Sequence, residues 1–192
     1  AGTGTIVLAS RRVVVENSTY ANNNTTDIAV INGLAIEGNA ESWAIAVEDI
    51  VGDNDGIELI TDGTSFYNFS TTDVVVTGNS HSGSGTDPDM DDIVNRPIGV
   101  IVGLVYRDSG FPVDNVIYDT IGESAFSTTD AGGNSNDNNI CVGGNTGGTF
   151  NSADLENLAA MMENFEVPSI DDVYRPAALF APFDCETMAG GD

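Results

Sequence analysis

Hydrophobic residues along the chain fall into short runs separated by clusters of Gly, Asn, Asp, Ser and Thr. This pattern is typical of β-strands joined by turns. Over 42–51 large apolar residues alternate with alanine with a period of two. As a strand, 97–107 would place Ile98, Val100, Val102, Leu104 and Tyr106 on one face. We therefore predict strands over 5–16, 27–37, 42–51, 56–61, 65–77, 97–107, 111–121 and 139–142.

The predicted strands recur at intervals typical of a β-sandwich or β-barrel. No long segments with helical periodicity separate them, which argues against a parallel sheet built from βαβ units. We expect a mainly β fold, namely a single antiparallel β-barrel or jelly-roll-like sandwich, and we find no internal repeat. Gly99 and Gly103 would share one face of the strand at 97–107, where glycine marks a bend or a close backbone approach.

One segment in the C-terminal half has the pattern of a short helix. Asn151 and Ser152 offer an N-cap, Asp154 lies in the first turn, and Pro168 follows the expected end. We expect this helix over 152–165, as part of a barrel domain formed by residues 1–167. Apolar residues recur along it with helical spacing, at Leu155, Leu158, Ala159, Met162 and Phe165.

Residues 168–192 are expected to form an extended C-terminal arm, because they contain prolines and a Gly-Gly pair. Cys141 and Cys185 could pair with each other, pair with another chain or stay as thiols, and the sequence does not decide between these. The arm carries apolar side chains that would dock on the chain's own barrel or on a neighbouring subunit: Val173, Tyr174, Leu179, Phe180 and Phe183.

The net charge of the chain indicates the salt concentration in which the protein folds. Five basic residues, all Arg, stand against 30 Asp and Glu, and the net charge is −25. So large a charge opposes a compact state, but at about 1 M salt the Debye length falls to roughly 3 Å and screens it. Disorder is excluded because 41% of the residues are hydrophobic and occur in strand-like runs. We therefore expect a protein adapted to very high salt, and without a basic patch we expect no direct binding to nucleic acid.

Candidate catalytic groups are few. The single histidine, His81, lies in a Ser- and Gly-rich stretch, without a Gly-x-Ser-x-Gly motif that would mark a nucleophile. We interpret His81 as a solvent-exposed loop residue and expect that the chain is not an enzyme. A carboxylate pair for glycoside hydrolysis among the 30 acids is the remaining alternative. Gly-rich stretches such as 143–148 lack the Lys of a phosphate-binding loop, so no cofactor is expected.

Two acidic stretches, 53–56 and 87–92, resemble the start of a calcium-binding loop, but neither completes the EF-hand pattern. Acidic turns on a halophilic surface are the simpler interpretation. The metal hypothesis is weak binding of a hard cation, Ca²⁺, Mg²⁺, Na⁺ or K⁺, at Asp87, Asp89 and Asp91.

The first residues lack the charged and apolar regions of a secretory signal, so either a signal was removed or the protein is made in the cytoplasm. No stretch approaches the roughly 20 apolar residues of a membrane-spanning helix. Motifs for N-glycosylation, which matter only if the chain is exported, begin at Asn17, Asn23, Asn24 and Asn68.

A lysine-free acidic chain of 20.0 kDa with a series of strands from 5 to 121 and a Pro-rich tail around 174–183 resembles a known capsid family. It is similar to the small major capsid proteins of haloarchaeal icosahedral viruses with an internal membrane, which form the vertical single β-barrel lineage. The resemblance implies a structural virion subunit, made in the host cytoplasm and without catalytic activity. Its partners would be copies of itself or a second capsid protein, above a membrane vesicle into which it does not insert.

The alternative is a secreted or cell-surface β-sandwich module of a halophilic archaeon, in a pilus, filament or surface layer. In that case the strand at 5–15 could add to the sheet edge of a neighbour, because strand addition requires only main-chain hydrogen bonds and pockets for alternate side chains.

Overall fold

The computed structural model describes residues 2–46, 49, 60–61, 64–91, 97–106, 112–154 and 180–185. The mainly β class is confirmed, and one α-helix, α1 (Pro97–Tyr106), lies within the described part. Short 3₁₀ helices accompany it, among them η1 (Gly33–Ala35), η2 (Ala40–Trp43) and η6 (Ala181–Phe183). The strands are β1 (Thr3–Leu8), β2 (Arg11–Glu16), β3 (Thr19–Ala21), β4 (Thr26–Ile31), β5 (Ala44–Ala46), β6 (Ile60–Thr61), β7 (Ser65–Tyr67), β8 (Thr72–Thr77), β9 (Ser80–Ser82), β10 (Val116–Tyr118), β11 (Ile140–Gly143) and β12 (Phe150–Ser152).

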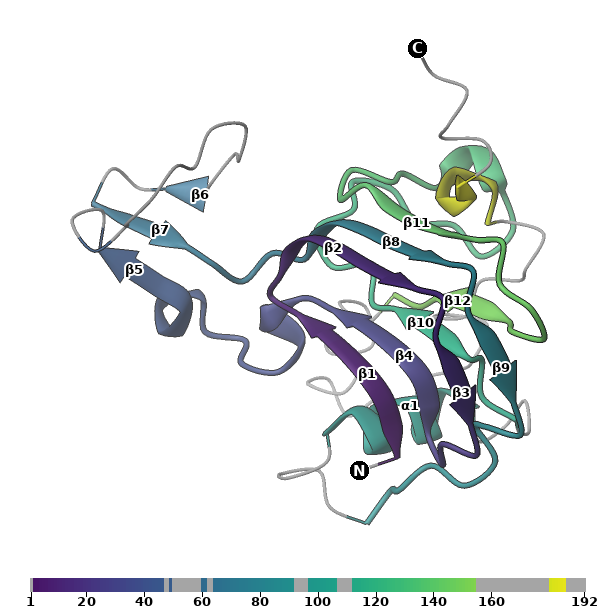
Figure 1. The fold of residues 1–192 in the computed structure, drawn as a ribbon. Helices are drawn as coiled ribbons and strands as arrows, with labels where there is room; N and C mark the ends of the chain where they lie inside the picture. The colour runs from purple at the N-terminus through teal and green to yellow at the C-terminus, as the bar shows by residue number, and fades with distance from the viewer. Residues whose placement is uncertain are drawn as a thin grey trace.

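The chain winds in coils, and the first two coils each add one strand to each of three parallel sheets (Figure 1). The first coil is β1, β2 and β3, and the second is β4, β8 and β9. The third is β10 and β11, followed by a parallel bridge from Thr146 to Ser80 in the second coil. The sheets have the orders β1-β4-β10-β12, β11-β8-β2 and β3-β9. This arrangement is a short parallel β-helix, in which each coil packs on its neighbours.

The predicted antiparallel barrel is therefore wrong, because these sheets are parallel and none of them closes. Antiparallel pairing occurs in the small sheet β5-β7-β6, which is inserted between β4 and β8 and lies to one side of the coils (Figure 1). Short apolar runs bounded by turn residues fit buried parallel strands as well as barrel strands, so the sequence pattern alone did not distinguish the two.

Equivalent apolar side chains of successive coils stack inside the helix. Val13 of β2 is in register with Val74 of β8, which is in register with Ile140 of β11. Val74 and Ile140 have no exposed surface, whereas Val13, in the first coil, is only partly buried. The core is thus a set of columns that run along the helix axis, and the described coils cover its middle more completely than its N-terminal end.

The stacking reveals a sequence repeat that we did not find from the sequence. The segments 12–18, 73–79 and 139–145 align as RVVVENS, DVVVTGN and NICVGGN, and each bends from the second sheet to the third. The residue at the bend has a positive φ in all three coils: 51° at Asn17 and 64° at both Gly78 and Gly144. Glycine and asparagine tolerate this left-handed conformation best, which explains their place in the repeat.

Residues 97–107 were predicted as a strand, but α1 occupies most of this range. It packs on the outer face of the first sheet, where its Val102 and Val105 contact Ile117 of β10. Gly99 and Gly103 are four residues apart and so share a helix face. A Cβ on Gly99 would lie 2.4 Å from the Asp89 carbonyl oxygen, so the absent side chains allow the chain at 89–90 to pack closely. An apolar run without polar positions fits either period, and the strand interpretation was the wrong one.

Other predicted boundaries also change. The segments 5–16 and 65–77 each contain two strands that belong to different sheets, and 27–37 and 111–121 shorten to β4 and β10. Asn151 and Ser152 lie in β12, so they do not cap a helix, and the rest of the predicted helix over 152–165 lies outside the described residues from 155 onward. Among the described residues, no helix has the length and apolar character needed to cross a membrane.

Candidate functional site

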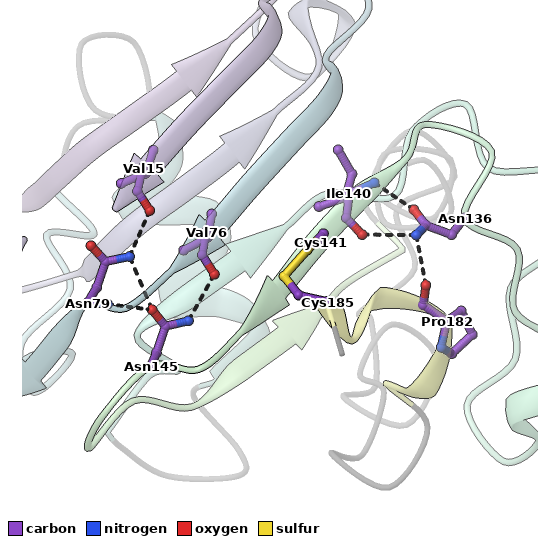
Figure 2. The surroundings of a disulfide bond; sticks show 9 residues. All are labelled: Val15, Val76, Asn79, Asn136, Ile140, Cys141, Asn145, Pro182 and Cys185. Carbon is purple, nitrogen blue, oxygen red and sulfur yellow. Dashed lines mark hydrogen bonds between the residues drawn. A yellow bond between two sulfur atoms is a disulfide. The ribbon is translucent and has the colours of Figure 1, made fainter. Parts of the chain in front are cut away.

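The C-terminal end of the described coils is closed by a short segment that a disulfide holds in place. Cys141 of β11 is bonded to Cys185, and their Cα atoms are 4.9 Å apart, within the usual range for a disulfide (Figure 2). Just before Cys185, η6 places Phe183 in the core, where its ring meets Tyr118 at 5.9 Å and Phe150 at 5.8 Å. The side chain of Phe183 has no exposed surface. The segment 180–185 is therefore a cap on the last coil.

Asn136 connects the cap to the last coil through side-chain hydrogen bonds to Pro182 and Ile140 (Figure 2). Its Nδ2 donates to the backbone oxygens of Ile140 at 2.9 Å and Pro182 at 2.8 Å. Its Oδ1 accepts from the backbone nitrogen of Ile140 at 2.8 Å. One amide thus joins the start of β11 to η6, close to the disulfide.

This placement decides part of the predicted interface. Phe183 and the half-buried Phe180 dock on the chain's own coils, since the Phe180 ring lies 4.7 Å from the Phe150 ring. The other predicted interface residues, Val173, Tyr174 and Leu179, lie outside the described residues.

A ladder of asparagines joins the coils at the bend between the second and third sheets (Figure 2). Asn79 Nδ2 donates to the Val15 carbonyl oxygen at 2.9 Å, and Asn145 Nδ2 donates to the Val76 carbonyl oxygen at 3.1 Å. In return, Asn79 Oδ1 accepts from the Ser18 backbone nitrogen at 3.0 Å, and Asn145 Oδ1 accepts from that of Asn79 at 2.9 Å. The ladder satisfies backbone groups at a bend where strand pairing is interrupted.

The single histidine lies inside the parallel β-helix, so the prediction that it is exposed is wrong. His81 belongs to β9, is 6% exposed, and stacks on Tyr20 of the coil before it, with 5.5 Å between ring centres. Its Nδ1 pairs with Asp27 Oδ2 at 2.8 Å, and neither side chain has exposed surface. On its other side, Gly148 leaves room for the ring, since a Cβ there would lie 2.6 Å from His81 Cδ2.

Asp27 is the centre of this buried polar cluster. Its Oδ1 accepts from Asn23 Nδ2 at 2.6 Å, and its Oδ2 accepts from Asn115 Nδ2 at 2.8 Å as well as pairing with His81. Burial by itself would raise the pKa of Asp27, but hydrogen bonds from Ser84, Asn23, His81 and Asn115 outweigh it and lower the pKa below its ordinary value. Through the Tyr20 stack on His81 and the Asn115 bond to Asp27, this cluster links three coils, and neither the His81 nor the Asp27 side chain has exposed surface.

A second buried carboxylate, Asp119, lies at the end of β10. Its Oδ2 accepts from the backbone nitrogen of Asn32 at 2.6 Å and its Oδ1 from that of Ile121 at 3.1 Å. Burial raises the pKa of Asp119 to about 7 in spite of these bonds. Asp119 is the one charged residue lining a small cavity of about 20 Å³ between α1 and the first sheet, which has room for about one water molecule. The carboxylate therefore positions two chain segments, the one after β4 and the one after β10.

Glu123 organises the segment between β10 and β11. Its carboxylate accepts from the Tyr118 hydroxyl at 2.7 Å and from Ser135 Oγ at 3.0 Å, while Asn138 Nδ2 donates to the same Tyr118 hydroxyl at 2.5 Å. Burial, assisted by Glu123, raises the pKa of Tyr118 above its ordinary value. These bonds join Tyr118, Glu123, Ser135 and Asn138 and so hold the polar segment between β10 and β11 together.

The predicted cation ligands form no cluster. Asp87 and Asp91 are exposed. The backbone nitrogen of Asp91 donates a hydrogen bond to Asp89 Oδ1 at 3.3 Å, which is a local turn contact. Within the described ranges, no group of three or more His, Cys, Asp or Glu side chains is placed to hold a metal ion. Weak cation binding here stays a prediction, and the other acidic stretch, 53–56, lies outside the described residues.

Sequence reasoning missed the ladder, the buried cluster and the cap. A signal for the ladder exists in the three aligned segments, where Ser18, Asn79 and Asn145 occupy the same position, although these residues are 61 and 66 positions apart in the sequence.

No family model, curated protein or solved structure matches this chain, so comparisons with known proteins do not assign the site a function.

Proposed function

We propose that this chain is a structural module of an exported protein of a halophile, in which stacked coils serve as a rigid spacer on a cell surface or in an extracellular filament. The observation that carries the proposal is the Cys141–Cys185 clip over the last coil. Disulfides persist in secreted and surface proteins and are rare in the cytosol of most organisms, so a disulfide that holds the cap supports the proposal of an oxidising compartment.

The use made of polar side chains supports a structural role. Asn79, Asn145 and Asn136 bind backbone groups of neighbouring segments, and His81 and Asp27 bind each other out of reach of solvent. These polar groups are thus used to bind neighbouring coils, as with Asn79 and Asn145, or to pair within the core, as with His81 and Asp27. In a stack of this kind, load along the axis is carried by many hydrogen bonds between adjacent coils, which suits a spacer.

The described fold differs from the one that the capsid hypothesis assumed. It depended on a single antiparallel barrel, whereas the sheets that form the body of this chain are parallel. Charge and salt adaptation are equally compatible with a virion and with a cell envelope, because both are exposed to the same brine. The exported surface module is therefore the function that we put forward, and the virion is an outcome that the test below can reveal.

The test is fractionation of producing cells, and of any particles they release, in molar salt. The chain is quantified by mass spectrometry in the envelope, cytoplasmic and particle fractions, with a cytoplasmic enzyme as the leakage control. We expect it in the envelope or in filaments sheared from it. Recovery in the cytoplasm contradicts the proposal, and recovery in icosahedral particles returns the capsid hypothesis.

A further inference from the structure

We propose that Asn17 is the acceptor of an N-linked glycan, and that folding selects it over the three other asparagines that carry the same sequence motif. This inference rests on the proposed function, because only an exported chain meets a glycosyltransferase of this kind. The motif requires Asn and, two residues later, Ser or Thr. An enzyme that reads both side chains on the folded protein needs both of them at the surface.

Only one of the four motifs satisfies this requirement. Asn17 is exposed at the tip of the bend between β2 and β3, and Thr19, two residues later, is also exposed. The side-chain amide of Asn17 makes no hydrogen bond to any part of the chain that the structure describes. The acceptor nitrogen of this motif is therefore open to an enzyme. The Thr19 hydroxyl accepts from Ser80 Oγ at 3.2 Å, but this contact is itself exposed, unlike the bonds of the buried Thr26.

The adjacent motifs at Asn23 and Asn24 are closed by burial of their hydroxyl residues. Asn23 requires Thr25, which is 1% exposed, and its own Nδ2 already donates to Asp27. Asn24 is exposed, but it requires Thr26, which has no exposed surface and whose Oγ1 is bonded to two backbone oxygens.

The fourth motif begins at Asn68, whose side chain is bound by Arg11. Asn68 is half-buried, and its Oδ1 accepts from Arg11 Nη1 at 2.9 Å. Its hydroxyl residue, Ser70, is also half-buried. Neither member of this pair is as open as its counterpart at Asn17.

The repeat shows that the bend does not require asparagine at position 17. Gly78 and Gly144 take the same left-handed conformation in the next two coils. A hydroxyl recurs two residues later in every coil, since Thr19 pairs with Ser80 and Ser80 with Thr146. Among the three described coils, the first alone combines this hydroxyl column with an asparagine, and it lies at the N-terminal end of the described stack.

The reaction transfers an oligosaccharide from a lipid-phosphate carrier. The Asn17 side-chain nitrogen attacks the anomeric carbon of the sugar, and a carbon–nitrogen bond forms as the bond from that carbon to the phosphate oxygen breaks. The lipid phosphate is the leaving group, and the amide nitrogen gives up one proton to a base of the transferase.

The experiment expresses the full chain with an export signal in a halophilic host and maps glycopeptides by mass spectrometry in the surface fraction. Three variants accompany it: Asn17→Gly, which keeps the bend as Gly78 does, Thr19→Ala, which removes the hydroxyl, and Thr19→Ser, which retains the motif. We expect a hexose-containing mass addition on the Asn17 peptide of the wild type and of Thr19→Ser, and its loss in the other two. The peptides with Asn23, Asn24 and Asn68 should be unmodified.

An unmodified Asn17 in protein recovered from the surface overturns the inference and leaves the proposed function standing. Occupancy of Asn24 equal to that of Asn17 overturns it as well, because burial of Thr26 would then have no effect. A chain that the same host retains in its cytoplasm despite the signal overturns both. Salt-dependent unfolding of each variant shows whether loss of a glycan reflects loss of the motif or loss of the fold.

Discussion

Removal of the Cys141–Cys185 clip should destabilise the coils by an amount that the chain geometry sets. The two cysteines are separated by 44 residues. For a loop of that length, restricting the unfolded chain contributes about 4 kcal/mol at 25 °C. The double variant Cys141→Ser/Cys185→Ser should therefore lower the free energy of unfolding by about 4 kcal/mol, with the slope of the urea transition altered only through a more expanded unfolded state.

The assay is urea unfolding in molar KCl, followed by tryptophan fluorescence and circular dichroism, for the oxidised protein and the double variant. The control is wild-type protein kept reduced by dithiothreitol, which should coincide with the double variant because both lack the covalent link. A difference below about 1 kcal/mol between oxidised protein and variant would contradict this prediction, since it would mean that the segment 180–185 is held without the disulfide.

Three further predictions concern single side chains. Asn79→Ala should lower the free energy of unfolding by about 2–5 kcal/mol, because it leaves backbone groups of the first coil without partners. As a control, Asn24→Ala alters an exposed side chain and should lower it by less than about 0.5 kcal/mol in the same urea assay. Phe183→Ala should cost about 3–5 kcal/mol, because it opens a cavity under the cap, and an unchanged urea midpoint would contradict that burial. Asp119 has a pKa raised from 3.8 to about 7, so the folded state binds its proton more tightly than the unfolded chain. Its contribution therefore makes unfolding free energy fall as pH rises from about 4 to about 7, by up to about 1.4 kcal/mol for each pH unit. Asp119→Asn should remove this component from the measured pH profile, and an identical slope in the variant would show that Asp119 does not titrate there.

The elements most visible in the sequence were the β-runs. The apolar triplets at 13–15 and 74–76 are strands, as their composition indicates, although Val14 is exposed and only Val74 and Val76 have no exposed surface. Their direction was not visible, because a buried parallel strand and a barrel strand present the same short apolar run. The inserted segments 32–71, 86–115 and 119–139 hid the coil period, since they separate equivalent strands by unequal numbers of residues.

The polar sites were less predictable still. His81 and Asp27 are 54 residues apart, and nothing local to either residue indicates that they pair in the core. His81 lies among Ser and Gly residues that suggest a loop, but these small residues in fact accompany a short strand against which the next coil packs. The partner of Cys141 was open for the same reason, because only the winding of the chain brings η6 beside β11.

The most direct test of the account is a thiol-trapping measurement on the protein from its native source. Cells are lysed in molar salt with an alkylating reagent, the envelope and cytoplasmic fractions are separated, and peptides with Cys141 and Cys185 are analysed without reduction. We expect a single cross-linked Cys141–Cys185 peptide, found in the envelope fraction. Two alkylated thiols on a chain that resides in the cytoplasm would contradict this expectation.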